Sequence, residues 1–125
     1  MFIRENPNPA NNLVGDCVIR AISILMDKSW TYVFFSLCSF ASTMFDMPSS
    51  NAVWGAYLID KGYRRKIIPN VCPDCYTVKQ FCKDHKRGRY LLATGTHVVT
   101  VINGNYYDTW NSGDEVPIYY FTKEE

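Results

Sequence analysis

A cysteine stands at the start of the first segment with helical periodicity. Cys17 follows Gly15-Asp16, and apolar residues recur after it at helical spacing, so we expect its thiol in the first turn of a helix capped by Asp16. Unpaired backbone N–H groups and the positive end of the helix dipole favour a thiolate there. The same N–H groups can hold an oxyanion on a bound substrate. Taken alone, Cys17 is more typical of a small buried hydrophobic residue.

A histidine and an aspartate follow in the second half of the chain. His97 opens an apolar segment with strand composition, where an imidazole needs a partner. Asp108 lies among aromatic residues, where a carboxylate is costly unless it is paired. Each has an ordinary alternative, as a core histidine and as a turn residue. Together with Cys17 they supply a nucleophile, a base and a residue that orients the base.

The loop between these two segments decides whether His97 and Asp108 can meet. Asn103-Gly104 is a strong signal for a two-residue hairpin loop. That loop places Val99 opposite Asp108, which makes His97 and Asp108 diagonal neighbours on one face of a sheet. A loop one residue longer would put them on opposite faces. We therefore predict the two-residue loop and a hydrogen bond between the imidazole and the carboxylate.

Three short motifs resemble those of papain-like cysteine peptidases. Gly15-Asp16-Cys17 resembles their nucleophile segment, Thr96-His97-Val98-Val99 their histidine strand, and Asp108-Thr109-Trp110 their Asn-Ser-Trp element. The resemblance covers most of the chain in order and is closest to short members from bacterial and phage genomes. It implies an α+β, papain-like fold, with the nucleophile at the start of the first helix and the helices packed on a C-terminal antiparallel sheet.

The resemblance also implies an activity and a set of roles. The catalytic residues would be Cys17 as nucleophile, His97 as general base and acid, and Asp108 as orienter, in place of the family's asparagine. Trp110 would screen the histidine–carboxylate hydrogen bond from water, and Asp16 would support the nucleophile. The family's oxyanion glutamine is missing, and Asn11 occupies roughly its place.

The implied reaction is cleavage of an amide bond in a protein or peptide substrate through a Cys17 acyl-enzyme, with no cofactor. Protease, amidase, deamidase and acyl or amine transferase all remain open, because the same three residues serve each of these reactions.

A second group of candidate ligands lies between the two halves. Cys72-Pro73-Asp74-Cys75 and Cys82-Lys83-Asp84-His85 could form a tetrahedral Cys₃His zinc site from Cys72, Cys75, Cys82 and His85. Val78, Phe81, Cys82 and His85 also have the spacing of a core-facing helical stripe. We favour core packing and expect no metal. A non-enzymatic protein-interaction module, possible with or without zinc, is the alternative function.

The elements that must position these residues follow an α+β order. Helices are expected from Cys17, from Ser29, from Ser49 or Ser50, and, as a short one, from Thr77 to His85. Strands are expected at 63–68, 90–93, 97–102, 106–110 and 118–121. Asn–Pro steps predict an irregular arm over 1–15. We expect a single papain-like domain over 1–125.

Charge and composition limit the expected partners. Thirteen basic and twelve acidic residues leave a net charge of +1, which gives no electrostatic reason to expect nucleic acid or an anionic membrane as a partner. We find no signal-peptide core and no segment of transmembrane length, and five cysteines are too few for a secreted disulfide framework. The expected location is cytoplasmic. The sequence makes no prediction of oligomeric state.

Overall fold

Most of the helices precede most of the strands in the computed structural model, which describes residues 1–69 and 75–123. Within these residues there are four helices and a six-stranded mixed sheet, which confirms the α+β class. Along the chain the elements are β1 (Phe2–Arg4), α1 (Cys17–Met26), α2 (Trp30–Met44), α3 (Asn51–Asp60), β2 (Arg64–Ile67), α4 (Val78–Asp84), β3 (Arg89–Ala93), β4 (Val98–Ile102), β5 (Asn105–Asp108) and β6 (Tyr119–Thr122).

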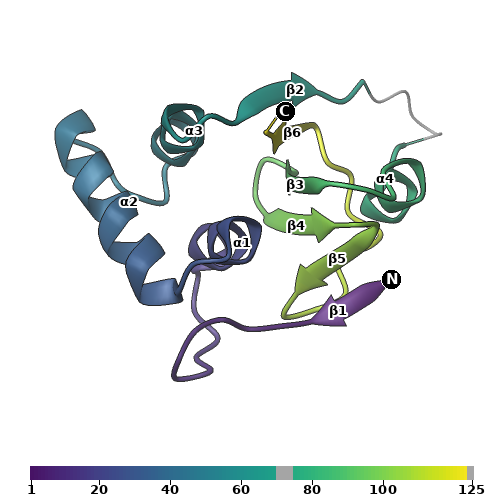
Figure 1. The fold of residues 1–125 in the computed structure, drawn as a ribbon, viewed down its shortest axis with the longest axis horizontal. Helices are drawn as coiled ribbons and strands as arrows, with labels where there is room; N and C mark the ends of the chain where they lie inside the picture. Colours follow the sequence, from purple (N-terminus) through teal and green to yellow (C-terminus); the bar gives the residue numbers. More distant parts are fainter. Residues whose placement is uncertain (70–74, 124–125) are drawn as a thin grey trace.

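The sheet has the strand order β1-β5-β4-β3-β6-β2, with β1 at the edge beside β5 (Figure 1). All pairings except one are antiparallel, and β1 runs parallel to β5. The prediction of an irregular arm over 1–15 is therefore wrong at Phe2–Arg4, as is the prediction of a wholly antiparallel sheet. A three-residue strand is too short to show a two-residue period in the sequence, and its partner lies about a hundred positions away.

Strand β1 holds the end of β5 that carries Asp108. The Glu5 N–H donates to the Asp108 carbonyl oxygen at 3.0 Å, and the Arg4 guanidinium donates to the carbonyl oxygen of Thr109. The N-terminal segment thus fixes the backbone on either side of the Asp108 side chain.

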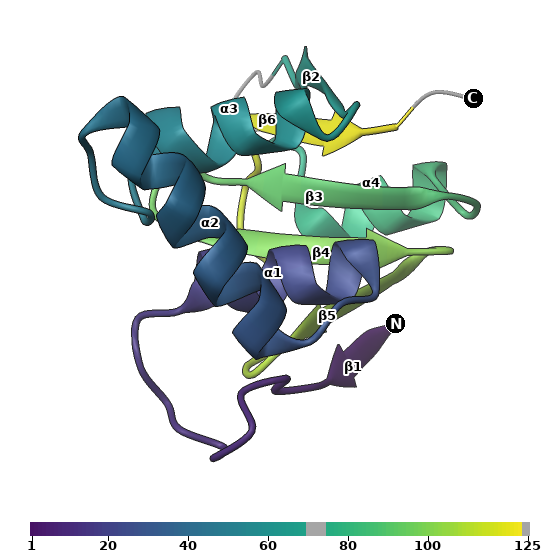
Figure 2. The ribbon, with the colours of Figure 1, turned by 60° about the vertical axis from the view of Figure 1, so that its left-hand side comes forward.

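Helices α1 and α3 lie on one side of the sheet with α2 packed against both from outside, and α4 lies on the other side (Figures 1 and 2). The two-residue period of β3 explains this division: Leu91 and Ala93 pack into the cluster with α1 and α3, whereas Leu92 packs into the cluster with α4.

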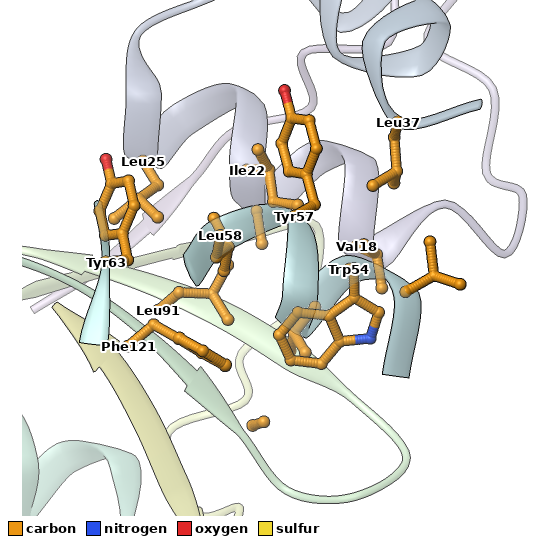
Figure 3. Packing of buried hydrophobic residues seen from close by; sticks show 14 of the residues in the cluster. Val18, Ile22, Leu25, Leu37, Trp54, Tyr57, Leu58, Tyr63, Leu91 and Phe121 are labelled. Carbon is orange, nitrogen blue, oxygen red and sulfur yellow. The ribbon is translucent and has the colours of Figure 1, made fainter. Parts of the chain in front are cut away.

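The larger core fixes α1 against the middle of the sheet (Figure 3). Ile22 of α1, Leu58 of α3 and Leu91 of β3 are fully buried. Burial of each such side chain contributes about 1.5–3 kcal/mol to folding. In addition, the Thr100 hydroxyl of β4 donates to the Ala21 carbonyl oxygen at 2.6 Å, within the core. The helix that begins with Cys17 is thereby anchored directly to β4.

Local sequence signals mark the starts of three helices. The Ser29 hydroxyl accepts a hydrogen bond from the Tyr32 N–H at 3.1 Å, and Thr77 forms a capping box with Gln80. Helix α3 follows Ser50, one of its two predicted starts. Each of these helix starts confirms the sequence prediction.

The β4–β5 hairpin has the predicted two-residue loop. Asn103 and Gly104 have φ values of 50° and 79°, the left-handed pair that a type I′ turn requires, and Ile102 faces Asn105. The register therefore places Val99 opposite Asp108, as the sequence predicts.

Among the helices at residues 1–69 and 75–123, none combines the length and the apolar character that a membrane crossing requires.

Candidate active site

Cys17 is the first residue of α1 and is half-buried. The His97 side chain and the Val98 backbone N–H lie close enough to its sulfur to stabilise the thiolate. Burial alone would raise the pKa of this thiol. The hydrogen bond and charge of His97, the Val98 amide and the charge of Arg20 outweigh burial and hold the pKa of Cys17 below its ordinary value of 9.0.

His97 lies in the turn between β3 and β4, immediately before β4 begins. The Thr94 hydroxyl accepts from the His97 N–H at 3.1 Å, and the Thr94 N–H donates to the His97 carbonyl oxygen at 2.9 Å, so the turn holds the backbone in place. The ring Nε2 is 2.6 Å from Asp108 Oδ2, which leaves Nδ1 for the sulfur of Cys17.

The imidazole is held in its protonated form. Burial alone would lower the pKa of His97, but the hydrogen bonds to Asp108 and Cys17, with the charges of both, raise it to about 9. Since the pKa of Cys17 is lowered and that of His97 is raised, the pair favours thiolate and imidazolium over thiol and neutral imidazole.

Asp108 ends β5 and is 3% exposed. Its Oδ2 accepts from the Ser112 hydroxyl at 2.7 Å as well as from His97, and its Oδ1 accepts from the Thr109 N–H at 2.8 Å. Burial would raise the pKa of this carboxyl, but the bonds from His97 and Ser112 lower it. Asp108 is therefore a fixed carboxylate, as an orienting residue must be.

Cys17, His97 and Asp108 meet at the end of the sheet rather than on one of its faces. Val99 and Tyr106 pack on the α4 side, and the two-residue period would put His97 and Asp108 on that side as well. Helix α1 covers the opposite side. Contact is possible because His97 precedes β4 and Asp108 ends β5, where the first turn of α1 reaches them.

The sequence analysis missed the role of Arg20, a guanidinium on the same helix as Cys17. Arg20 is 7% exposed, pairs with the Asp16 carboxylate and reaches Asp108 Oδ1 at 3.7 Å. Its signal in the sequence was a charged residue between Ile19 and Ala21 on an otherwise apolar helix. A buried charge of this kind needs partners, and the partners here are two carboxylates. The Ser112 hydroxyl was missed as well, because nothing distinguished it from an ordinary loop serine.

Asp16 corrects one prediction. It precedes α1, but its side chain makes no capping hydrogen bond to the helix. The carboxylate instead binds Arg20 one helical turn along and accepts from the Trp30 indole N–H at 2.9 Å. The charged guanidinium outcompetes the backbone N–H groups as a partner, so the first turn of α1 has no side-chain cap.

Trp110 lies beside His97, with ring centroids 4.9 Å apart and an interplanar angle of 38°. Trp110 thus contacts the imidazole, as the sequence predicts. The residue remains 43% exposed, so it shields the imidazole only in part.

A cleft of about 270 Å³ opens beside the start of α1, and Gly15, Cys17, Asn51, Trp54 and His97 are among the residues that line it. Asn11 does not line this cleft. It is exposed in a turn with φ of 55°, where its N–H donates to the Asn8 carbonyl oxygen at 2.9 Å. The structure therefore does not bring Asn11, the predicted oxyanion residue, to Cys17.

The second group of candidate ligands has a different character. Cys72 lies outside the described residues, and Cys75 is disulfide-bonded. Cys82 is buried with Val78 and Phe81, as the core-packing interpretation predicts, and burial raises the pKa of its thiol. Over residues 1–69 and 75–123 no group of three or more His, Cys, Asp or Glu side chains is placed to hold a metal ion.

Comparisons of the chain with protein-family models, with curated proteins and with solved structures found no match, so the chemistry of this site has to be inferred from its geometry.

Proposed function

We propose that this protein is a cysteine hydrolase with a papain-like arrangement of catalytic groups, and that it cleaves an amide bond in a protein or peptide. The single observation that carries the proposal is that the His97 ring interacts with both the Cys17 thiol and the Asp108 carboxylate, and that its Nε2 is 2.6 Å from Asp108 Oδ2. Nucleophile, base and orienter are the three roles that covalent acyl transfer requires.

The first half of the reaction forms an acyl-enzyme. The Cys17 thiolate attacks the carbonyl carbon, a C–S bond forms, and the carbonyl π electrons move to oxygen. When the intermediate collapses, the C–N bond breaks and the leaving nitrogen takes the proton of the His97 imidazolium. The amine departs neutral, and the acyl group stays on sulfur as a thioester.

The second half returns the enzyme to its starting state. Neutral His97 removes a proton from water as the water oxygen attacks the thioester carbon. The C–S bond then breaks, and the electron pair leaves with sulfur. This step restores the thiolate–imidazolium pair and releases a carboxylic acid. Asp108 supports the imidazolium in both halves because its carboxylate is held on Nε2.

The start of α1 supplies donors for the oxyanion. Asp16 makes no side-chain cap to this helix, because its carboxylate is bound to Arg20 and Trp30. The backbone N–H groups of the first turn are thus not occupied by a capping side chain. They lie next to the sulfur, where the positive end of the helix dipole also favours the developing negative charge.

Two observations favour the enzyme over a non-enzymatic interaction module. The Cys17 thiol interacts with the His97 side chain rather than being buried away from it. The proposed zinc staple would also need Cys75 and His85, but Cys75 is disulfide-bonded and the His85 ring is stacked on Phe81 with centroids 3.8 Å apart.

A chloroacetamide probe with mass spectrometry of the labelled peptides tests the proposal. At neutral pH we expect Cys17 to be modified well before Cys38, a second half-buried free cysteine that serves as the internal control. A His97→Ala variant should lose this preference. Equal labelling of Cys17 in the two proteins would show that His97 does not activate the thiol and would contradict the proposed mechanism.

A further inference from the structure

The cleft beside Cys17 has the size of a subsite for one residue. Its volume of about 270 Å³ lies just below the range of about 300–1,000 Å³ typical of pockets for whole small ligands. Cys17 and His97 form part of its wall. A group bound there would lie next to the substrate carbonyl carbon that the sulfur attacks.

The lining of this cleft is uncharged apart from the catalytic pair. None of the described residues that line it is a lysine, arginine, aspartate or glutamate. A charged substrate group entering the cleft would lose its hydration without gaining an opposite charge. A carboxylate would in addition meet the negative sulfur of Cys17. The cleft thus favours an uncharged group.

Asn51 provides a directional hydrogen-bond donor at this cleft. Its Oδ1 accepts from the Trp54 indole N–H at 2.9 Å. Trp54 is fully buried in the core with α1 and α3 (Figure 3). Because its indole N–H can only donate, this bond fixes the orientation of the Asn51 amide, with Oδ1 toward Trp54 and Nδ2 away from it. The Nδ2 group then carries two N–H donors that no hydrogen bond within the described residues uses, and Asn51 is exposed.

We propose that this cleft is a carboxamide subsite, in which Asn51 Nδ2 donates to the side-chain carbonyl oxygen of a substrate glutamine or asparagine. The proposal rests on the proposed function and names the substrate class for it. An uncharged carbonyl-bearing side chain satisfies the amide donor and avoids the cost of burying a charge. Lysine offers no acceptor for Asn51, and methionine offers only a weak one.

Asn51→Asp tests the donor with little structural disturbance. An aspartate keeps an oxygen for the Trp54 indole N–H, whereas alanine would leave that buried donor unpaired. The new carboxylate also stands in the first turn of α3, where a negative charge is favourable. The variant therefore removes the two N–H donors and adds a negative charge to the cleft.

Asn103→Asp is the matched control. Asn103 Oδ1 accepts from the Gly88 N–H at 3.0 Å, and an aspartate keeps that acceptor. The residue lies in the hairpin loop that follows β4, at the opposite end of this strand from His97. The chemical change is the same, but it is made away from the cleft.

Four acetylated dipeptide vinyl sulfones that end in Gln, Met, Glu or Lys make a suitable probe set. Cys17 sulfur adds to the vinyl carbon, and the adjacent carbon takes the proton of His97, so no group leaves. Each inactivation rate is divided by the rate with iodoacetamide, which reports the reactivity of the thiol without a bound side chain. We expect the Gln probe to be faster than the others by roughly tenfold, the worth of one good hydrogen bond.

Asn51→Asp should abolish the preference for Gln over Met and raise the relative rate of the Lys probe, whereas Asn103→Asp should keep the parent ranking. Equal rates for Gln and Met in the parent, or an unchanged ranking in Asn51→Asp, would overturn the subsite. Equal slowing of all four probes would indicate that Asn51 binds a backbone carbonyl and would also overturn it. Failure of iodoacetamide itself to modify Cys17 would overturn the proposed function, and the subsite with it.

Discussion

Two cysteine–histidine combinations lie in different parts of the molecule, and their surroundings shift the pKa values of the two thiols in opposite directions. Cys17 and His97 meet at the end of the sheet reached by α1, and the pKa of Cys17 is lowered. Cys82 lies in α4 and His85 caps the C-terminal end of that helix, and the pKa of Cys82 is raised. Burial raises the pKa of both thiols, so burial does not explain the difference.

The partners of each histidine explain why the pKa values of the two thiols shift in opposite directions. Asp108 holds the Nε2 of His97 at 2.6 Å and turns the other nitrogen toward sulfur. His85 instead stacks on the Phe81 ring, and its Nδ1 lies 3.0 Å from the Phe81 carbonyl oxygen. The comparison teaches that a cysteine and a histidine close in sequence or in space do not by themselves give a thiol with a lowered pKa. The difference between the two sites is the fixed carboxylate behind His97.

Replacing Cys17 or Cys82 by alanine should produce the largest difference between the two sites. We expect Cys17→Ala to abolish probe labelling at this site and hydrolysis, while it lowers the free energy of unfolding by less than about 2 kcal/mol. Cys82→Ala should leave Cys17 labelling unchanged and cost about 1 kcal/mol, because it removes a small buried side chain. Full hydrolysis by Cys17→Ala on an established substrate would contradict the proposed function.

Substitution of Asp108 should have the next largest effect. Asp108→Ala removes the group that orients His97, and we expect turnover to fall roughly 100-fold, within the usual worth of a positioned general base. Asp108→Asn keeps an oxygen for the ring but not the charge. It should retain more turnover than alanine and lower the pKa of His97. The control is Asp84→Ala on α4, and turnover should be the same as in the parent. A pH–rate profile of each variant checks these expectations.

Removal of the buried ion pair behind the nucleophile should have a moderate effect. Asp16→Asn with Arg20→Met removes both charges together, and an oxygen remains for the Trp30 indole N–H. Since the charge of Arg20 helps to lower the pKa of Cys17, this pKa should rise and alkylation at pH 6 should slow. The exposed Lys79–Asp114 pair on the α4 side is the matched control. Its neutral double variant should alkylate like the parent.

Trp110→Ala should have the smallest effect. Trp110 contacts the His97 ring but is 43% exposed, so we expect turnover to fall by less than about tenfold. Tyr120, whose ring centroid is 6.0 Å from that of His85, gives the comparison, because Tyr120→Ala should leave turnover unchanged. A loss greater than 100-fold in Trp110→Ala would mean that the ring does more than shield the hydrogen bond.

Local signals made part of this arrangement predictable from the sequence. The φ preferences of Asn103-Gly104 fix the hairpin loop, and the loop fixes the register that brings Asp108 to His97. Capping residues such as Ser29 and Thr77 mark helix starts for the same reason, since their partners lie within three residues.

The contacts that escaped prediction are long-range or competitive. The parallel pairing of Phe2–Arg4 with β5 joins segments at opposite ends of the sequence. Asp16 follows a capping pattern, but a charged partner on the next turn takes its carboxylate. Asn51 lines the cleft only because α3 packs beside α1, and no spacing in the sequence relates Asn51 to Cys17.

The pH dependence of Cys17 alkylation by iodoacetamide, followed by mass spectrometry in the parent and in His97→Ala, tests the central claim most directly. In the parent, the rate should rise with pH around a midpoint below 9.0, because the pKa of Cys17 is lowered from that ordinary value. In His97→Ala the midpoint should move to higher pH. Hydrolysis should also decline above about pH 9, where His97 loses the proton that the leaving amine needs. A parent midpoint at or above the ordinary value of 9.0, unchanged in His97→Ala, would contradict the account.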